Sequence, residues 1–229
     1  MQGAIRLLPR SARGLVGASL ALGFFAMKLL KASASVEVDV QANTATLGSD
    51  STGWVFSNGD VNGTLTETYS SGTYGPTIEI VKVARSDYLR AGASYWRQNG
   101  LSPSAATLLA NRWVSLRDTS TNIGSSLSIA GIADKAMEDL AGWGSPGRGS
   151  FDGQAALGLN SAGQSHHLEV ATSGPGYPIE IEAAPEADRI LFSAWNQGTA
   201  PSVPGGAAPS HYLPSYQSPV LAAIESVVL

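Results

Sequence analysis

The stretch of residues 167–193, HLEVATSGPGYPIEIEAAPEADRILFS, carries the strongest structural signal in the sequence. Apolar and polar residues alternate through three short segments of it. The apolar members are Leu168, Val170, Ile179, Ile181, Ile190 and Phe192. Because neighbouring side chains of a strand point to opposite faces, a period of two collects apolar residues on one face. The stretch therefore predicts antiparallel strands with one buried and one solvated face.

The first third of the chain extends this sheet. Residues 36–77 are rich in Ser, Thr and Gly and contain turn signals such as Asn62-Gly63, and Ile78–Ala84 reads as a further strand. Glycine and asparagine in tight turns supply the positive φ angles that hairpins need. We expect a β-meander here.

Helices are expected only in the middle of the chain. Ala93–Asn99 is expected to form a short helix, and Ser102 is the expected N-cap, with Pro103 at the first helical position, of a second helix over Ser104–Asn111. Ser126–Ala141 has apolar residues at helical spacing, with charged residues on the other side. The fold class expected is α+β: a curved antiparallel half-barrel sheet with a few helices packed on its concave face.

The N-terminal 34 residues differ from the rest. Three arginines precede the apolar run Gly14–Ala26, and Ala32-Ser33-Ala34 matches an A-x-A cleavage pattern. We expect residues 1–34 to be a signal peptide or an N-terminal membrane anchor; an amphipathic helix belonging to the fold is the other interpretation. Residues 35–204 would form the folded domain, and residues 205–229, rich in Pro, Gly and Ser, a flexible tail.

Composition excludes several functions. The chain has no cysteine, which excludes a disulfide framework, a thiolate metal site and a lipidated N-terminal cysteine. Residues 1–34 hold five basic and no acidic residues, so the remainder has nine basic and 18 acidic residues, a net charge of −9. Such an acidic body repels phosphate backbones, and we expect no nucleic-acid partner.

Three patterns that could carry chemistry are better explained by structure. Residues 142–147, GWGSPG, match G-x-G-x-x-G but follow a helix instead of a strand. The side chains of His166 and His167 would point to opposite faces of one strand. Glu180 and Glu182 alternate with isoleucines, as on the outer face of a sheet. We expect no catalytic residues, no metal, no cofactor and no enzymatic activity.

Two blocks of the sequence carry a family resemblance. Ile80–Leu116 contains a strand, a turn, a short Tyr-Trp helix, an Ala/Leu helix and a Trp-Val strand. Leu168–Pro204 contains Gly176-Tyr177-Pro178-Ile179 followed by a strand that ends in Phe192-Ser193-Ala194-Trp195. In combination these blocks resemble the actinobacterial LolA-like lipoproteins of the LppX/LprG type, without the cysteine that members of the family lipidate.

The resemblance implies a function. Members of the family hold acyl chains of lipids or lipoglycans in an apolar cavity between sheet and helices. We therefore expect a monomeric, extracytoplasmic lipid-binding and lipid-transport protein of the cell envelope, secreted or membrane-anchored through its N-terminal segment, with an acyl-chain lipid or glycolipid as ligand. A structural or protein-docking envelope module with a packed core is the alternative, because the two share one hydrophobic pattern.

The implied cavity would be lined by the apolar faces of the two longer helices and the inward strand residues. The expected lining residues are Leu108, Leu109, Ile129, Ile132, Ala133, Met137, Leu140, Leu157, Leu159, Leu168, Val170, Ile179, Ile181, Ile190 and Phe192. The expected rim residues are Tyr95, Trp96, Trp113 and Tyr177.

Overall fold

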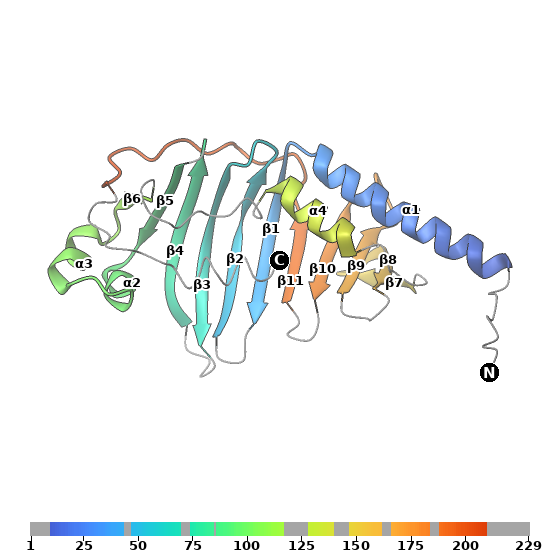
Figure 1. The fold of residues 1–229 in the computed structure, drawn as a ribbon, viewed down its shortest axis with the longest axis horizontal. Helices are drawn as coiled ribbons and strands as arrows, with labels where there is room; N and C mark the ends of the chain where they lie inside the picture. The colour runs from blue at the N-terminus through green and yellow to red at the C-terminus, as the bar shows by residue number, and fades with distance from the viewer. Residues whose placement is uncertain are drawn as a thin grey trace, which may run out of the picture.

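The fold is a single open sheet with helices against it (Figure 1). The structure, a computed structural model, describes residues 10–43, 47–69, 74–84, 86–116, 128–139, 147–161, 166–183 and 188–209. The sheet has eleven strands in the order β6-β5-β4-β3-β2-β1-β11-β10-β9-β8-β7, and every neighbouring pair is antiparallel. The strands are β1 Ser35–Asn43, β2 Leu47–Phe56, β3 Val61–Tyr69, β4 Tyr74–Val83, β5 Ser86–Ala91, β6 Trp113–Ser115, β7 Gly147–Phe151, β8 Gln154–Asn160, β9 His166–Ala171, β10 Pro178–Ala183 and β11 Asp188–Ser193. The α+β class and the antiparallel meander are confirmed.

Four helices are described. They are α1 Arg10–Ala32, α2 Ala93–Gln98, α3 Pro103–Leu109 and α4 Ile129–Asp139. Figure 1 shows α1 and α4 side by side along the half of the sheet that contains β1 and β11 to β7, whereas α2 and α3 lie at the β6 end. Among the described helices, none is long and apolar enough to cross a membrane.

The inner face of the sheet is continuous across the join between its two halves. β1 pairs with β11, so that Val38 lies opposite Phe192 and Val40 opposite Ile190. Ile190 in turn lies opposite Ile181 of β10. Because paired residues share a face, the alternation seen in the last third of the sequence becomes one apolar surface, as expected.

The second half of α1 is part of this core. Ala26, Met27 and Leu30 are fully buried, and they belong to the same cluster as the apolar residues of the inner face. An ion pair also joins α1 to α4, since Lys31 Nζ lies 2.6 Å from Asp134 Oδ1. These contacts place the end of α1 in the core of the structure, whichever interpretation of the N-terminal segment holds.

The helix boundaries follow from local chemistry. The Ser102 hydroxyl accepts a hydrogen bond from the Ala105 amide at 3.3 Å, and Pro103 opens α3, as predicted. α2 is followed by Gly100 at φ +86°, a left-handed conformation that glycine adopts without strain. The helix predicted over Ser126–Ala141 begins at Ile129 as α4, after Ser128, and residues 140 and 141 lie outside the described part.

The chain stays on the sheet beyond residue 205, where a flexible tail was expected to begin. The Ala208 amide donates to the Trp113 carbonyl at 2.8 Å, and the Ser115 amide donates to the Ala208 carbonyl at 2.9 Å. Ala208 is buried and forms a parallel bridge with Val114. Residues up to Ala208 therefore cover part of the β6 edge, and residues 210–229 lie outside the described part.

Candidate functional site

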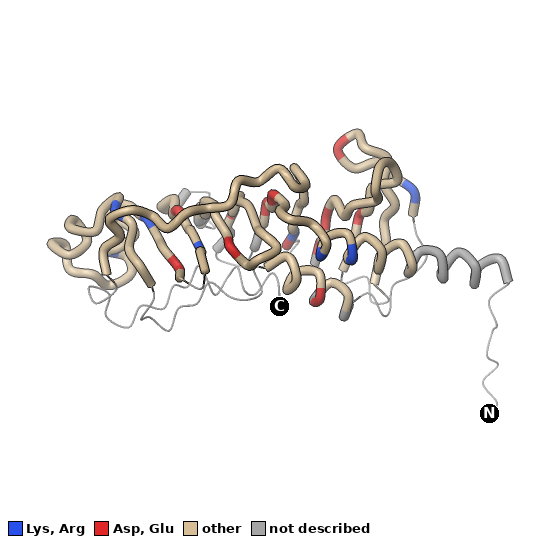
Figure 2. Tube along the Cα trace, turned by 90° about the horizontal axis from the view of Figure 1, so that it is seen from above, with Lys and Arg blue, Asp and Glu red and all other residues tan. Residues whose placement is uncertain are grey.

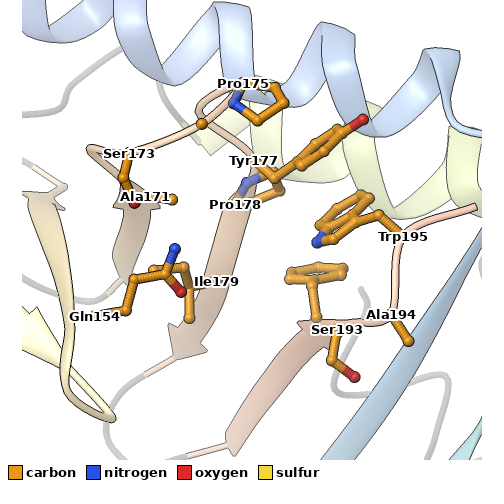
Figure 3. A pocket seen from close by; sticks show the side chains of 12 residues that line it. Gln154, Ala171, Ser173, Pro175, Tyr177, Pro178, Ile179, Ser193, Ala194 and Trp195 are labelled. Carbon is orange, nitrogen blue, oxygen red and sulfur yellow. The ribbon is translucent and has the colours of Figure 1, made fainter.

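A cavity of about 480 Å³ lies where β9 and β11 end and β10 begins (Figure 3). Its lining comes from the end of β9, the loop and strand start that follow, the end of β11, and the start of β8. The lining residues are Gln154, Ala171, Ser173, Gly174, Pro175, Tyr177, Pro178, Ile179, Phe192, Ser193, Ala194 and Trp195. This volume lies within the range of roughly 300–1,000 Å³ that is usual for small-molecule sites.

The loop between β9 and β10 is held in place by backbone hydrogen bonds. Gly174 and Gly176 have φ angles of +71° and +82°, which permits the tight reversal after Ala171. The Ala171 amide donates to the Tyr177 carbonyl at 3.0 Å and closes the loop. The Thr172 amide and hydroxyl both donate to the Ala155 carbonyl at 3.0 Å, which ties the loop to β8.

Three aromatic rings form one wall of the cavity. The rings of Tyr177 and Trp195 stack with their centroids 4.2 Å apart and their planes 5° from parallel. The Phe192 ring lies 6.0 Å from that of Trp195. In Figure 3 Tyr177 and Trp195 converge from the β10 and β11 sides. Offset stacking of this kind gives a rigid apolar surface.

Trp195 is positioned by the first strand of the sheet. It lies between two residues of positive φ, Ala194 at +45° and Asn196 at +59°. The Asn196 amide donates to the Ser35 carbonyl at 2.8 Å, and the Asn196 side chain accepts from the Ala34 amide at 2.7 Å. The turn that presents the indole is therefore fastened to the start of β1.

The chemistry of the lining is apolar with a few polar groups. None of the twelve residues that line it carries a charge, and the polar side chains are those of Gln154, Ser173, Ser193 and the Tyr177 phenol. Ser193 already donates to Glu37 Oε2 at 3.0 Å. Such a surface suits an apolar ligand that is oriented by one or two hydrogen bonds.

Three of the residues expected to form a ligand site meet in this cavity: Tyr177, Ile179 and Phe192. The others that the structure describes on the inner face pack into the core. Those fully buried are Leu109, Ile129, Ile132, Ala133, Leu159, Leu168, Val170 and Ile190, and those partly buried against them are Met137, Leu157 and Ile181. Leu140 lies outside the described residues.

Leu108 faces solvent instead of the interior, with 51% of its surface exposed. The reason is the helical repeat, since α3 buries Ala106 and Leu109 and so turns the intervening residues outward.

The aromatic residues expected at the rim do not share one location. Tyr95 and Trp96 are buried, with ring centroids 5.3 Å apart, and Trp96 Nε1 donates to the Ala91 carbonyl at 3.2 Å. The half-buried Trp113 ring lies 5.0 Å from the Arg90 guanidinium. These three residues lie towards the β6 end, whereas Tyr177 precedes β10, on the other side of the sheet's centre. Tyr95 and Trp96 of α2 pack in the core, Trp113 stacks on Arg90 of the adjacent strand, and none of the three lines the cavity beside Tyr177.

Most of the cavity lining was missed by sequence reasoning. Ala171, Ser173, Pro175 and Trp195 lie at strand ends and in loops, where alternation of apolar and polar residues stops. The available signal was the clustering of Gly, Pro and aromatic residues between β9 and β10. That cluster was interpreted as a hairpin turn. Its Tyr177 was not predicted to stack on Trp195 and form one wall of the cavity with it.

The outer face of the same strands holds a polar group. His167 Nε2 lies 2.8 Å from Glu169 Oε1, and its Nδ1 lies 2.7 Å from Asn160 Oδ1. Within the described residues, no three His, Asp or Glu side chains are arranged to hold a metal ion.

Glu180 of β10 is a buried carboxylate, with 6% of its surface exposed. Burial raises the pKa of the Glu180 carboxyl, and the charge of Glu182 raises it further, while Arg189 opposes the rise.

We expect Glu180→Gln to increase the free energy of unfolding slightly at neutral pH. A raised pKa in the folded state means that ionisation costs more in the folded than in the unfolded chain. Stability from this group is thus present below the ordinary glutamate pKa and is lost as the pH rises through the raised value. Urea unfolding at several pH values should show a flatter pH dependence for the variant.

A suitable control for Glu180→Gln is Asp152→Asn, which removes one charge at an exposed turn. The prediction fails if the two variants respond to pH in the same way, because the effect would then come from net charge and not from burial.

Comparison with known proteins was made for both sequence and structure. No family model and no curated protein matches the sequence. Among solved structures, LprF from Mycobacterium bovis superposes with a TM-score of 0.52 at 15% sequence identity, over 84% of this chain and 98% of that one. The chain has the fold of LprF. The Mycobacterium tuberculosis lipoprotein LppX gives a TM-score of 0.47 at 14% identity, over 80% of this chain and 97% of that one.

The likeness to LprF concerns the fold. It spans nearly all of LprF and includes most of this chain. The resemblance that was recognised in Ile80–Leu116 and Leu168–Pro204 is thereby confirmed for the arrangement of strands and helices.

Proposed function

We propose that this protein binds an acyl-chain lipid or glycolipid, with its acyl chain in the cavity beside Tyr177 and Trp195. The observation that carries the proposal is the lining itself: a half-open cavity of about 480 Å³ is lined mainly by apolar and aromatic side chains, with no charged one among them. The family resemblance of the sequence, whose expected fold LprF shares, supports the same ligand class. Binding without catalysis is the corresponding activity.

The energetics of such a site favour acyl chains. Burial of a methylene group contributes about 0.8 kcal/mol, so roughly ten methylenes contribute on the order of 8 kcal/mol before the cost of ordering the ligand. Apolar burial therefore supplies much of the binding free energy without a specific polar contact. The hydroxyl and amide groups of Ser173 and Gln154 can then bind a head group where the lining is polar.

We further propose that the protein acts outside the cytoplasm, in the cell envelope, and carries its ligand as a monomer. The support for this is the family resemblance. In this proposal, one part of the inner face lines the ligand site, and another part packs the sheet against the helices.

The first test is ligand binding to the full chain. Native mass spectrometry of protein purified from its source should reveal bound lipid, and an acyl probe brominated along its chain should quench the fluorescence of Trp195. Trp195→Phe identifies this contribution among the five tryptophans. A chain that is free of lipid and leaves the probe unbound would contradict the proposal and favour a packed structural module.

The second test fills the cavity. We expect Ile179→Trp to weaken binding of dodecanoate at least about tenfold, which corresponds to about 1.4 kcal/mol, because the larger ring occupies the space of the chain. Isothermal titration calorimetry measures this change. Leu191→Trp is the matched control, since Leu191 is a half-buried residue of the adjacent strand that does not line the cavity. Equal affinities for both variants would place the ligand elsewhere.

A further inference from the structure

α1 has an exposed apolar surface opposite its buried one. Ala26, Met27 and Leu30 are fully buried, whereas Phe24 and Phe25 are 39% and 51% exposed. Among the described residues, the other large apolar side chains with comparable exposure are Leu108 and Val203, which lie singly on other segments. Two adjacent phenylalanines on one helix form an unusual exposed pair, because aromatic side chains normally lie within the core.

Basic residues accompany this pair. Lys28 is exposed one turn beyond Phe24 and Phe25 and is followed by Lys31, which pairs with Asp134. The sequence of α1 contains four basic residues and no acidic one, whereas the chain after residue 34 has a net charge of −9. Figure 2 shows blue and no red segments along the described half of α1, whereas the strands and loops carry both colours. The helix that exposes the phenylalanines therefore carries only positive charge, while the rest of the chain is acidic in net charge.

We propose that α1 binds the surface of an anionic lipid bilayer, lying along it with Phe24 and Phe25 inserted among the head groups and Lys28 beside the phosphates. Exposed aromatic residues combined with lysines on one helical face are the features that hold amphipathic helices at a bilayer interface. The acidic remainder is repelled by the same surface, so the charge distribution also orients the molecule with α1 towards the lipid.

This orientation brings the cavity to the bilayer. α1 contacts β9 and β10, and the end of β9 and the start of β10 line the cavity. Figure 3 shows α1 running past the loop that carries Pro175 and Tyr177. If the cavity binds acyl chains as proposed above, an α1 bound to lipid would hold it beside the source or destination of its ligand. The binding of α1 itself does not depend on that function.

Vesicle flotation with the full chain tests the inference. We expect binding to vesicles of phosphatidylcholine mixed with phosphatidylglycerol, weaker binding to pure phosphatidylcholine, and weakening by salt. Replacing both phenylalanines, Phe24→Ser with Phe25→Ser, should lower the partition coefficient about tenfold or more. Lys28→Glu should lower binding to the anionic vesicles only.

Matched controls distinguish vesicle binding by the exposed surface of α1 from binding by any exposed apolar side chain and from binding through the cavity. Leu108→Ser with Val203→Ser removes two equally exposed apolar side chains and should leave vesicle binding unchanged. Ile179→Trp should also float like the wild type, even where it no longer binds dodecanoate. Thermal unfolding followed by circular dichroism verifies that each variant is folded.

Three outcomes for vesicle binding through α1 would overturn the inference. They are a wild-type chain that does not float with anionic vesicles, a folded double phenylalanine variant that floats as well as the wild type, and equal losses for the Leu108 and Val203 control. Loss of binding in Ile179→Trp would attribute flotation to the cavity and would equally contradict a role for α1.

Discussion

Trp96→Ala is expected to lower the free energy of unfolding by about 3–5 kcal/mol, the range observed when a buried tryptophan or phenylalanine is truncated. Trp96 is fully buried and lies edge-on to Tyr95, with ring centroids 5.3 Å apart. Its indole N–H donates to the Ala91 carbonyl at 3.2 Å, at the point where β5 passes into α2. The substitution leaves a cavity and removes this donor, and both effects destabilise the folded state.

The matched control for Trp96 is Trp113→Ala. Trp113 is half-buried on β6 and stacks under Arg90 at 5.0 Å, so its truncation leaves a smaller cavity. Chemical unfolding should show a clearly smaller loss for Trp113→Ala. Comparable losses would mean that α2 contributes little to the core, contrary to the packing described above.

Leu30→Asp is expected to destabilise the protein by more than about 4 kcal/mol, because it removes a buried leucine and introduces an unpaired charge in its place. Leu30 is fully buried, and it belongs to the same core cluster as Ile132 and Ala133 of α4 and the inner face of the sheet. Since the stability of a domain is commonly 5–15 kcal/mol, we expect a largely unfolded chain at 37 °C. Circular dichroism melting measures the change.

Phe25→Asp tests the same chemistry on the other side of α1. Phe25 is 51% exposed, so an aspartate there remains solvated and should change the stability by less than about 1 kcal/mol. A small effect of Leu30→Asp, close to that of Phe25→Asp, would show that α1 is not part of the folded unit. The comparison therefore decides between a helix of the fold and an N-terminal segment that only precedes it.

The join between α1 and β1 explains why this comparison matters. The predicted cleavage pattern Ala32-Ser33-Ala34 lies there. The Ser33 hydroxyl donates to the Leu29 carbonyl at 2.9 Å, and the Ala34 amide donates to Asn196 at 2.7 Å. Cleavage after Ala34 would separate α1 from the sheet and would expose the core residues that α1 covers.

Much of the fold could be predicted because its signals are local. Ser102 and Pro103 mark the start of α3 through capping chemistry that involves only neighbouring residues. Strict alternation in β9, β10 and β11 identifies the buried face before any partner strand is known. The N-terminal segment was harder to interpret, since an apolar run looks alike whether it enters a membrane or packs on a sheet.

The candidate site was predicted less well than the fold. Ile179 and Phe192 were chosen because they belong to the apolar face, and the same criterion selected Leu159 and Leu168, which fill the core. Hydrophobic pattern reports burial but not whether the buried surface faces protein or a cavity. Trp195 was placed at the end of the last predicted strand, yet its stacking on Tyr177 depends on how the strand ends meet.

The sequence by itself determined the kinds of secondary structure, the apolar face of the sheet and the separation of basic and acidic residues, because each depends on residue type and short-range spacing. Only the tertiary structure decided where the cavity lies, since antiparallel pairing brings together residues 154, 171–179 and 192–195 from separate strand ends. It also decided that the apolar run of α1 divides, with Met27 and Leu30 in the core and Phe25 exposed. The physical reason is that burial depends on what packs against a residue, which its own neighbours in sequence do not specify.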